Sequence, residues 1–314
     1  MKTVFTGSSS FTGYWFIKEL AKAGHEVIAT FKGKSEDYSG IRRKRVDEIL
    51  TLCRCEFECA FGSQRFLNLL KKTSQIDLLC HHYADVTNYK SPDFDVLSAI
   101  GNNTENIRPI LRILKDKNCN KVLITGSFFE QNEGAGSDNL KAFSPYGLAK
   151  GLTSEIFRFY TAATPMKLGK FVIPNPFGPY EESRFTSYLM RSWIEGNIPS
   201  VTSSLYVRDN IHVLLLARAY AWFAGCLDDT PGFQKLNPSG YPESQGSFAK
   251  RVAGEMRARL DIPCELTFPE QKEFPEPLVR INTDVVARFF NDWDEKQAWD
   301  ELAEYYQERL SPQR

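Results

Sequence analysis

The chain has 314 residues, a length that allows a large buried core and a cofactor domain carrying a smaller second domain. Its 39 basic and 39 acidic residues cancel, which excludes a strong general attraction to nucleic acid or an anionic membrane and favours a small-molecule partner. The longest apolar run, residues 213–227, contains Arg218 and is too short to span a bilayer. The first residues lack the apolar stretch of a signal peptide, so we expect a cytoplasmic protein.

Short apolar runs alternate with amphipathic stretches over the first half of the chain. This alternation predicts a parallel sheet covered by helices on both faces. Helices are expected at 13–24, 96–117 and 143–165, because apolar residues recur there at helical spacing. Right-handed crossovers then give an α/β fold with a doubly wound parallel Rossmann sheet. The expected strands are 2–6, 25–31, 55–61, 77–82, 121–126 and 168–173.

A glycine-containing turn follows the first expected strand. Residues 6–13 read Thr-Gly-Ser-Ser-Ser-Phe-Thr-Gly and lead directly into an amphipathic helix. Gly7 permits a tight turn, Gly13 lets the helix pack closely on the strand, and backbone N–H groups at the helix start attract phosphate. We predict that the turn holds the pyrophosphate of a dinucleotide, with an ordinary strand-to-helix loop as the alternative. The predicted contacts are Gly7, Ser9, Ser10, Phe11, Thr12 and Gly13.

The second expected strand does not end in the acidic residue that usually accepts hydrogen bonds from the adenosine ribose of NAD. It ends in Phe31 and is followed by Lys32, whose ammonium attracts a 2′-phosphate. We therefore predict NADP as the cofactor, with NAD possible and a lysine-rich surface turn as the alternative. The basic run at 42–45 is interpreted as a solvated helix start, or as a neighbour of the adenosine end of the cofactor.

Tyr146 and Lys150 stand four residues apart in an expected helix, so their side chains share one face. A free tyrosine has a pKa of about 10. A nearby ammonium favours the phenolate and brings the tyrosine into the range of acid–base catalysis at neutral pH. Ser127 follows the strand at 121–126, and a serine at the carboxyl end of such a strand points into the crevice where ligands bind. The three side chains are candidates for one catalytic group.

Serine, tyrosine and lysine in this order resemble the catalytic triad of the extended short-chain dehydrogenase/reductase family, of the NAD-dependent epimerase/dehydratase type that modifies nucleotide sugars. The turn at 6–13 is similar to the family's G-x-x-G-x-x-G fingerprint, with Ser10 in place of the middle glycine. That serine adds a Cβ near the pyrophosphate, so we expect a slightly displaced or less tightly bound cofactor. Other segments similar to the family, spread over nearly the whole chain, are 82–84, Asn103 with Asn106, 174–179 and 208–213.

The resemblance implies a role for each site residue. Tyr146 exchanges the proton on the substrate oxygen, Lys150 holds the nicotinamide ribose and lowers the tyrosine pKa, and Ser127 orients the carbonyl or alcohol. Further residues implied to line the cofactor are His82, Tyr83, Ala84, Asn103, Thr125 and Pro174. Those implied to contact the substrate are Asp85, Ser127, Asn175, Arg208 and Arg280. The guanidinium groups suit the substrate phosphates, and Arg208 is favoured over Arg280.

Beyond residue 173 the alternation stops and prolines accumulate. We interpret this part of the chain as a smaller, irregular C-terminal substrate-binding lobe. The dinucleotide-binding Rossmann domain is assigned to residues 1–173 and 201–237. The substrate-binding lobe is assigned to residues 174–200 and 238–314.

The resemblance implies a nucleotide-sugar substrate but leaves the reaction type open. Family dehydratases follow the catalytic hydroxyl with Asp-Glu, whereas Phe128 and Phe129 follow Ser127 here, and phenyl rings do no acid–base chemistry. Because the predicted NADP site favours net reduction, we predict NADP-dependent reduction of the keto group of a nucleoside-diphosphate keto-sugar. The alternatives are a nucleotide-sugar epimerase with tightly bound NAD and a non-catalytic NADP-binding regulatory protein.

Cysteines and histidines invite a metal interpretation that the spacing does not favour. Three cysteines between residues 53 and 59 lack a second Cys or His pair at zinc-site spacing, so free thiols and no metal are expected. His81 and His82 adjoin at a strand end, where successive side chains point to opposite faces. His212 precedes an apolar helix and is expected to be a packing residue.

The helices expected at 96–117 and 143–165 carry apolar residues on more than one face. Family dimers pair these two helices in a four-helix bundle, so the resemblance implies a homodimer. We expect no nucleic-acid or membrane partner.

Overall fold

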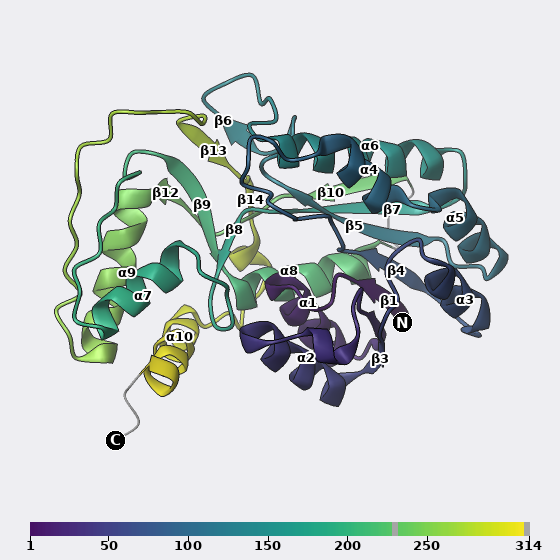
Figure 1. Cartoon of the computed structure of the whole chain (residues 1–314), viewed down its shortest axis with the longest axis horizontal. Coiled ribbons are helices and arrows are strands. Elements are labelled where there is room, and N and C mark those ends of the chain that lie inside the picture. Colours follow the sequence, from purple (N-terminus) through teal and green to yellow (C-terminus); the bar gives the residue numbers. More distant parts are fainter. Residues whose placement is uncertain (228–231, 311–314) are drawn as a thin grey trace. The chain divides into compact units, whose positions relative to one another are not determined.

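The structure is a computed structural model that describes residues 1–227 and 232–310, and Figure 1 shows its helices and strands. The chain forms two compact units. The first comprises Met1–Glu133, Leu140–Ile173 and the described residues of Ala217–Asn237. The second comprises Gly134–Asn139, Pro174–Leu216 and the described residues from Pro238 onward. Residues 201–216 thus lie in the second unit, although the sequence grouped them with the first, because their strand pairs with other strands of the second unit.

The first unit is built on a sheet of seven strands in the order β10-β7-β5-β4-β1-β2-β3, and all neighbours pair in parallel. From β1 the sheet grows in both directions, so the winding reverses between β1 and β4, the place where such sheets bind ligands. The predicted α/β fold with a doubly wound parallel sheet is confirmed. The strands are β1 (Lys2–Thr6), β2 (Glu26–Thr30), β3 (Arg54–Glu56), β4 (Leu78–His81), β5 (Lys121–Ser127), β7 (Lys167–Ile173) and β10 (Phe233–Leu236).

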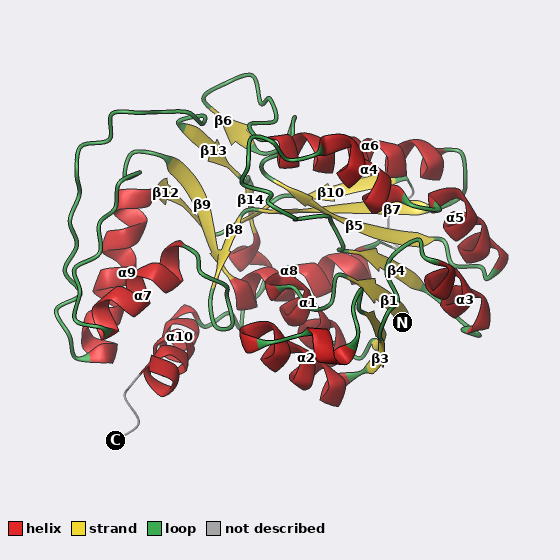
Figure 2. Ribbon diagram, viewed as in Figure 1, coloured by secondary structure: helices red, strands yellow, loops and turns green. Residues whose placement is uncertain are grey.

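Helices cover both faces of this sheet (Figure 2). One face carries α3 (Gln64–Lys72), α4 (Val96–Thr104), α5 (Ile107–Asp116) and α6 (Pro145–Ala162). The other carries α1 (Phe11–Lys22), α2 (Gly40–Leu52) and the C-terminal part of α8 (Val213–Cys226). Phe16 of α1 stacks on Tyr220 of α8 at 4.0 Å between ring centroids, and both rings contact Phe171 of β7. Burial of these large apolar rings stabilises the packing of helices on the sheet.

Two elements are shorter than the sequence predicts. The strand predicted to reach residue 61 stops after three residues, because Glu58 turns the chain with a φ of 51°. The helix predicted at 96–117 is divided into α4 and α5, because Asn106 lies between them with a φ of 53° and a left-handed residue cannot continue a helix. The helix predicted at 143–165 is α6, whose first turn is capped by the hydroxyl of Ser144.

The second unit has a sheet in the order β12-β9-β13-β6, with β8 beside β9, and a separate pair β11-β14. Three helices, α7 (Phe185–Ile194), α9 (Gln245–Leu260) and α10 (Glu295–Leu310), contribute to an apolar core in which Phe177 stacks on Trp299 at 5.3 Å. The strands are β6 (Ala135–Gly136), β8 (Asn175–Phe177), β9 (Val207–His212), β11 (Pro238–Ser239), β12 (Tyr241–Ser244), β13 (Val279–Ile281) and β14 (Asp284–Val285). Among the described residues, no helix has the length and apolar character needed to cross a membrane.

Candidate active site

The turn between β1 and α1 is too tight for side chains at its two glycines. Gly7 has a φ of 78°, and a Cβ there would lie 2.8 Å from the backbone N of Tyr83. A Cβ on Gly13 would overlap the carbonyl oxygen of Gly7. The turn therefore packs directly on the end of β4. A helix N-terminus with bare backbone beside it fits the pyrophosphate of a dinucleotide.

Ser10 occupies the middle position of the turn with φ and ψ of −72° and 162°, an extended conformation that any residue adopts. Its hydroxyl donates to the carbonyl oxygen of Gly7 at 2.9 Å and accepts the N–H of Gly13 at 3.1 Å. The side chain thus bonds to the backbone of its own turn and caps α1. The backbone conformation explains why the turn forms without a middle glycine.

His82 joins this turn to a neighbouring strand end. Its Nε2 lies 3.0 Å from the hydroxyl oxygens of both Ser10 and Thr12, and its Nδ1 lies 2.9 Å from the hydroxyl oxygen of Thr125. Burial, together with the Lys150 ammonium, lowers the pKa of His82 to about 3, so the ring is neutral at physiological pH. His82 therefore holds α1 and β5 in place through hydrogen bonds and does not exchange protons near neutral pH.

Ser127 ends β5, and Tyr146 and Lys150 lie in the first turns of α6. The Lys150 ammonium is buried and donates to the carbonyl oxygen of Thr125. Burial lowers the pKa of Lys150 to about 8, although the charge of Glu130 raises it. The first unit thus places a serine hydroxyl at a strand end and a readily deprotonated ammonium on the helix that carries the tyrosine.

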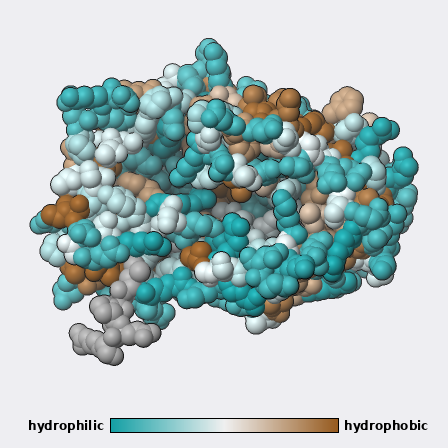
Figure 3. All heavy atoms as spheres, in the orientation of Figure 1, coloured by the Kyte–Doolittle hydropathy of each residue, from teal (hydrophilic) through white to brown (hydrophobic). Residues whose placement is uncertain are grey.

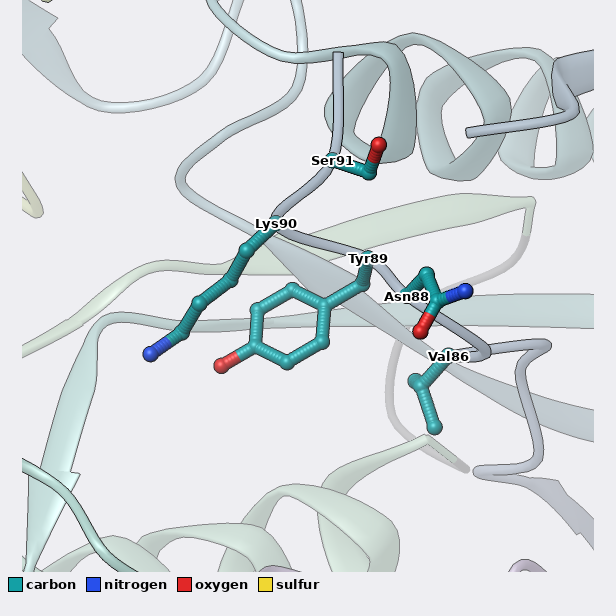
Figure 4. A pocket seen from close by; sticks show the side chains of 5 residues that line it. All are labelled: Val86, Asn88, Tyr89, Lys90 and Ser91. Carbon is teal, nitrogen blue, oxygen red and sulfur yellow. The ribbon is translucent and has the colours of Figure 1, made fainter. Parts of the chain in front are cut away.

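Tyr146 lies in an aromatic environment at this edge of the unit. Its ring contacts Tyr89 at 5.4 Å between centroids, Phe94 at 6.0 Å and Phe129 at 6.4 Å. Tyr89 also lines a cavity of about 470 Å³, and Figure 4 shows its ring beside the Lys90 side chain. The cavity is wide open to solvent, and all the residues that line it belong to one loop. The cavity is lined by Val86, Asn88, Tyr89, Lys90 and Ser91.

The buried Asn103 and the partly buried Asp85 connect α4 to the loop after β4. The side-chain oxygen of Asn103 accepts the Asp85 N–H at 2.8 Å, and its amide donates to the hydroxyl of Thr153 at 3.3 Å. The Asp85 carboxylate accepts the N–H of Thr87 at 3.0 Å and the amide of Asn102 at 2.8 Å. Both predicted site residues therefore also support the loop that leads to the cavity. Tyr83 and Ala84 lie at the start of the same loop and are partly buried.

The residue that follows β2 is aromatic. Phe31 is buried and stacks on Phe57 at 4.7 Å between ring centroids, and Lys32 follows it with an exposed side chain. The sequence has no carboxylate at this position, and the structure shows a stacked pair of aromatic rings there. In the basic run, Arg45 is fully buried, so the interpretation of that whole run as solvated is wrong.

In the second unit, Arg208 and Arg280 are direct neighbours across the parallel pair β9–β13. Both are buried, and each is held by a carboxylate of its own unit: Arg208 Nη2 lies 2.8 Å from Glu276, and Arg280 Nη2 lies 3.1 Å from Asp138. Asn175 begins β8 and is partly buried, directly after the buried Pro174. Each guanidinium group is therefore fixed by its own carboxylate partner, on neighbouring strands of this unit.

The model of the NAD dependent epimerase/dehydratase family matches residues 3–237. This chain belongs to that family. It is an enzyme of the NAD-dependent epimerase/dehydratase type. A comparison with curated protein sequences found no match.

Solved structures of epimerase/dehydratase proteins share the fold over the whole chain. UDP-glucuronic acid 4-epimerase from Bacillus cereus is 15% identical, covers 98% of this chain and 99% of its own, and has a TM-score of 0.74. UDP-glucose 4-epimerase from Thermotoga maritima is 15% identical, with 99% and 100% covered and a TM-score of 0.70. The dTDP-glucose 4,6-dehydratase DesIV from Streptomyces venezuelae is 15% identical, with 98% of both chains covered and a TM-score of 0.71.

His81, His82 and His212 of this epimerase/dehydratase protein contact aromatic side chains. His81 contacts Phe61 and Phe157, whereas His82 contacts Phe5 and Phe16, so the two imidazoles lie on opposite faces of the sheet as predicted. His212 is buried in the core of the second unit. All seven cysteines are free thiols. Within residues 1–227 and 232–310, no three His, Cys, Asp or Glu side chains are grouped as a metal site.

Two features near the catalytic residues were not predicted from the sequence. Tyr89 lines the cavity with its loop and contacts the Tyr146 ring, and Glu130 is a fully buried acid three residues after Ser127. A buried acid requires a partner, and the partner of Glu130 is Lys170 on the next strand, which no local pattern reveals. The one available signal was the lysine within the apolar run at 168–173.

Proposed function

We propose that this enzyme epimerises a sugar activated by a nucleoside diphosphate, using a nicotinamide dinucleotide that is reduced and reoxidised within each catalytic cycle. The observation that carries the proposal is the buried Lys150, one helical turn after Tyr146 in α6, whose ammonium donates to the Thr125 carbonyl oxygen two residues before Ser127 at the end of β5. Membership of the family and the resemblance in fold to UDP-sugar 4-epimerases support it. This reverses the order that the sequence favoured, in which keto-sugar reduction came first.

The bound cofactor would accept a hydride from the sugar carbon and return it. The chain's own residues handle the proton. The Tyr146 oxygen takes the proton of the sugar hydroxyl as the carbonyl forms and gives it back afterwards, Lys150 stabilises the phenolate, and Ser127 donates a hydrogen bond to the sugar oxygen. Residues of the turn, with Lys32, His82, Tyr83, Ala84, Asn103, Thr125 and Pro174, are proposed to hold the cofactor.

The second unit is proposed to bind the nucleotide part of the substrate. Arg208 and Arg280 lie opposite each other on β9 and β13, and we propose that their guanidinium groups bind the phosphates of a nucleoside diphosphate, with Asn175 and Asp85 as polar contacts. Phe128 is buried and Phe129 packs against Tyr146, so neither supplies the acid–base pair that dehydration requires. These two phenyl rings therefore support epimerisation over dehydration.

Reduction of a keto-sugar by NADPH is the second candidate. It is favoured by one observation, the exposed Lys32 after the aromatic end of β2, where NAD-preferring sheets usually carry a carboxylate. Product analysis separates the two. Incubation of the protein with UDP-hexoses and catalytic NAD, followed by chromatography, should yield the epimeric UDP-hexose. Conversion of only keto-sugars with stoichiometric NADPH consumption would support the reductase, and binding without any conversion would support a non-catalytic regulatory protein.

Lys32→Asp should selectively weaken NADPH binding. The change removes a charge-assisted hydrogen bond to the 2′-phosphate, an effect of about 1.5–3 kcal/mol or roughly 10- to 150-fold in affinity. It also adds an acceptor for the ribose hydroxyls of NADH, so NADH affinity should not fall. Titrations of both cofactors at fixed ionic strength measure this. Lys34→Asp, the same charge change two residues later, is the matched control, and equal losses in the two variants would refute the assignment of Lys32.

A homodimer through α4 and α6 is expected. Leu97 of α4 and Phe159 of α6 are 80% and 73% exposed, and Leu148 and Leu152 continue the apolar stripe on α6. Figure 3 shows hydrophobic atoms gathered over these helices. A second copy would bury this face in a four-helix bundle. Light scattering should give twice the chain mass, and Phe159→Asp should give monomers, whereas Leu50→Asp on α2 should not. A wild-type monomer at micromolar concentration contradicts this.

A further inference from the structure

Beneath the catalytic residues lies a cluster of buried charges, here called the Glu130 cluster, made of Glu130, Glu133, Lys170 and Lys235. Lys170 Nζ lies 2.6 Å from both Glu130 Oε2 and Glu133 Oε1, and Lys235 Nζ lies 2.9 Å from Glu133 Oε2. Both glutamates and Lys170 are buried. Two acids and two lysines balance, so the cluster is neutral as a whole. Removing charges from water is costly, and ion pairs this deep stabilise a fold weakly in comparison with apolar packing.

The backbone of β5 is shaped around this cluster. A Cβ on Gly126 would lie 2.7 Å from Lys170 Cε and 3.1 Å from Glu130 Oε1. Gly126 therefore lets the ion pair lie directly against the strand end. Its two neighbours in the chain are Thr125 and Ser127. The carbonyl oxygen of Thr125 accepts a hydrogen bond from the Lys150 ammonium. The ion pair thus touches the segment that carries the catalytic serine.

Glu130 contacts both elements of the catalytic group. Its Oε1 accepts the backbone N–H of Ser127 at 2.7 Å. Its Oε2 accepts the hydroxyl of Ser154 at 3.3 Å, and that hydroxyl also donates to the carbonyl oxygen of Lys150 at 3.0 Å. One carboxylate therefore links the serine at the end of β5 to the turn of α6 that begins at Lys150.

Few other charges act on Lys150. The charge of Glu130 favours its ammonium, and that of Lys170 disfavours it. His81 and His82 at the end of β4 are neutral near physiological pH, because burial lowers the pKa of both rings. Tyr146 is on the same helix and is the group that Lys150 serves. Glu130 and Lys170 therefore act on Lys150 with opposite signs.

We propose that Glu130 is a positioning residue of the active site, which fixes the Ser127 backbone and, together with Lys170, sets the electrostatic environment of Lys150. The catalytic part of this inference rests on the proposed function. In the proposed function, Glu130 contacts neither the substrate nor the cofactor. It acts through Ser127 and Lys150.

The test measures the protonation of Lys150 directly by ¹³C NMR of lysine Cε in the full-length protein, with Lys150→Met identifying the signal. Glu130→Gln keeps an acceptor for the Ser127 N–H but removes the charge, so the Lys150 midpoint should fall by about one pH unit. Lys170→Met should raise it. The double variant Glu130→Gln/Lys170→Met, which leaves no unpaired charge, should titrate near the wild-type value and is the control for folding.

Opposite shifts of the Lys150 midpoint in the two single variants, cancelled in the double variant, support the proposal. They do so even if the protein converts no nucleotide sugar. That second result would refute only the proposed function. A Lys150 midpoint that stays constant, or moves the same way in both single variants, overturns it, because a merely structural role predicts no sign change. If one single variant does not fold, the Lys150 midpoints of the other single variant and of the double variant are compared with the wild-type midpoint in the same way. In the active enzyme, Glu130→Gln should lower kcat severalfold and leave KM nearly unchanged.

Discussion

Replacing Tyr146 by phenylalanine is expected to lower turnover by about 10²- to 10⁴-fold, the usual contribution of a positioned acid–base group. The ring would still contact Tyr89 and Phe94, so the site should keep its shape, and only the oxygen that exchanges the proton is lost. Cofactor binding should therefore remain nearly intact. Steady-state turnover and cofactor titration of the same preparation measure the two effects separately.

Tyr89→Phe is the matched control, because it removes a phenolic hydroxyl from the cavity beside Tyr146 and leaves the catalytic oxygen in place. It should retain most of the turnover. If Tyr146→Phe turned over as fast as the wild type, or if Tyr89→Phe lost as much, Tyr146 would not be the proton-exchanging group.

Lys150→Met is expected to impair both turnover and cofactor affinity, because the ammonium serves the phenolate and the nicotinamide ribose. A lost hydrogen bond to a charged group corresponds to about 1.5–3 kcal/mol, or roughly 10- to 150-fold in cofactor affinity. Turnover should fall further, because the Tyr146 phenolate also loses its cation. Fluorescence titration of the reduced cofactor and steady-state kinetics measure the two losses. A variant with unchanged cofactor affinity would contradict the double role.

The pH dependence follows from the same residue. Because burial lowers the pKa of Lys150 to about 8, its ammonium is present below that pH and is lost as the pH rises through it. Wild-type turnover should therefore decline above about pH 8, whereas Lys150→Arg, whose guanidinium stays charged, should not show this decline. If turnover of Lys150→Arg declined in the same way, the decline above about pH 8 would come from another titrating group.

Much of the first unit could be predicted from the sequence, because its signals are local. The glycine turn follows directly on β1, and Tyr146 and Lys150 share one helix, so spacing alone placed them together. The left-handed Asn106, which divides the predicted helix, was not predicted, because a single backbone conformation leaves no periodic trace.

The features that depend on distant residues were not predictable. Glu130 is recognisable as a buried acid only when Lys170, from the next strand, pairs with it. Arg208 and Arg280 lie far apart in sequence and become neighbours only through the parallel pairing of β9 and β13. Neither pairing follows from hydrophobic periodicity, which reports which face of an element is buried and not what it meets there.

The measurement that tests the central claim most directly is the fate of hydrogen at the epimerised carbon, examined first at C4 of a UDP-hexose. The substrate carries deuterium at that carbon, and the reaction runs in ordinary water with catalytic cofactor. Hydride transfer to the cofactor and back predicts that the epimeric product retains the deuterium, without net change in absorbance of the reduced cofactor. Loss of the deuterium to water, or steady accumulation or consumption of reduced cofactor, would contradict the proposed function.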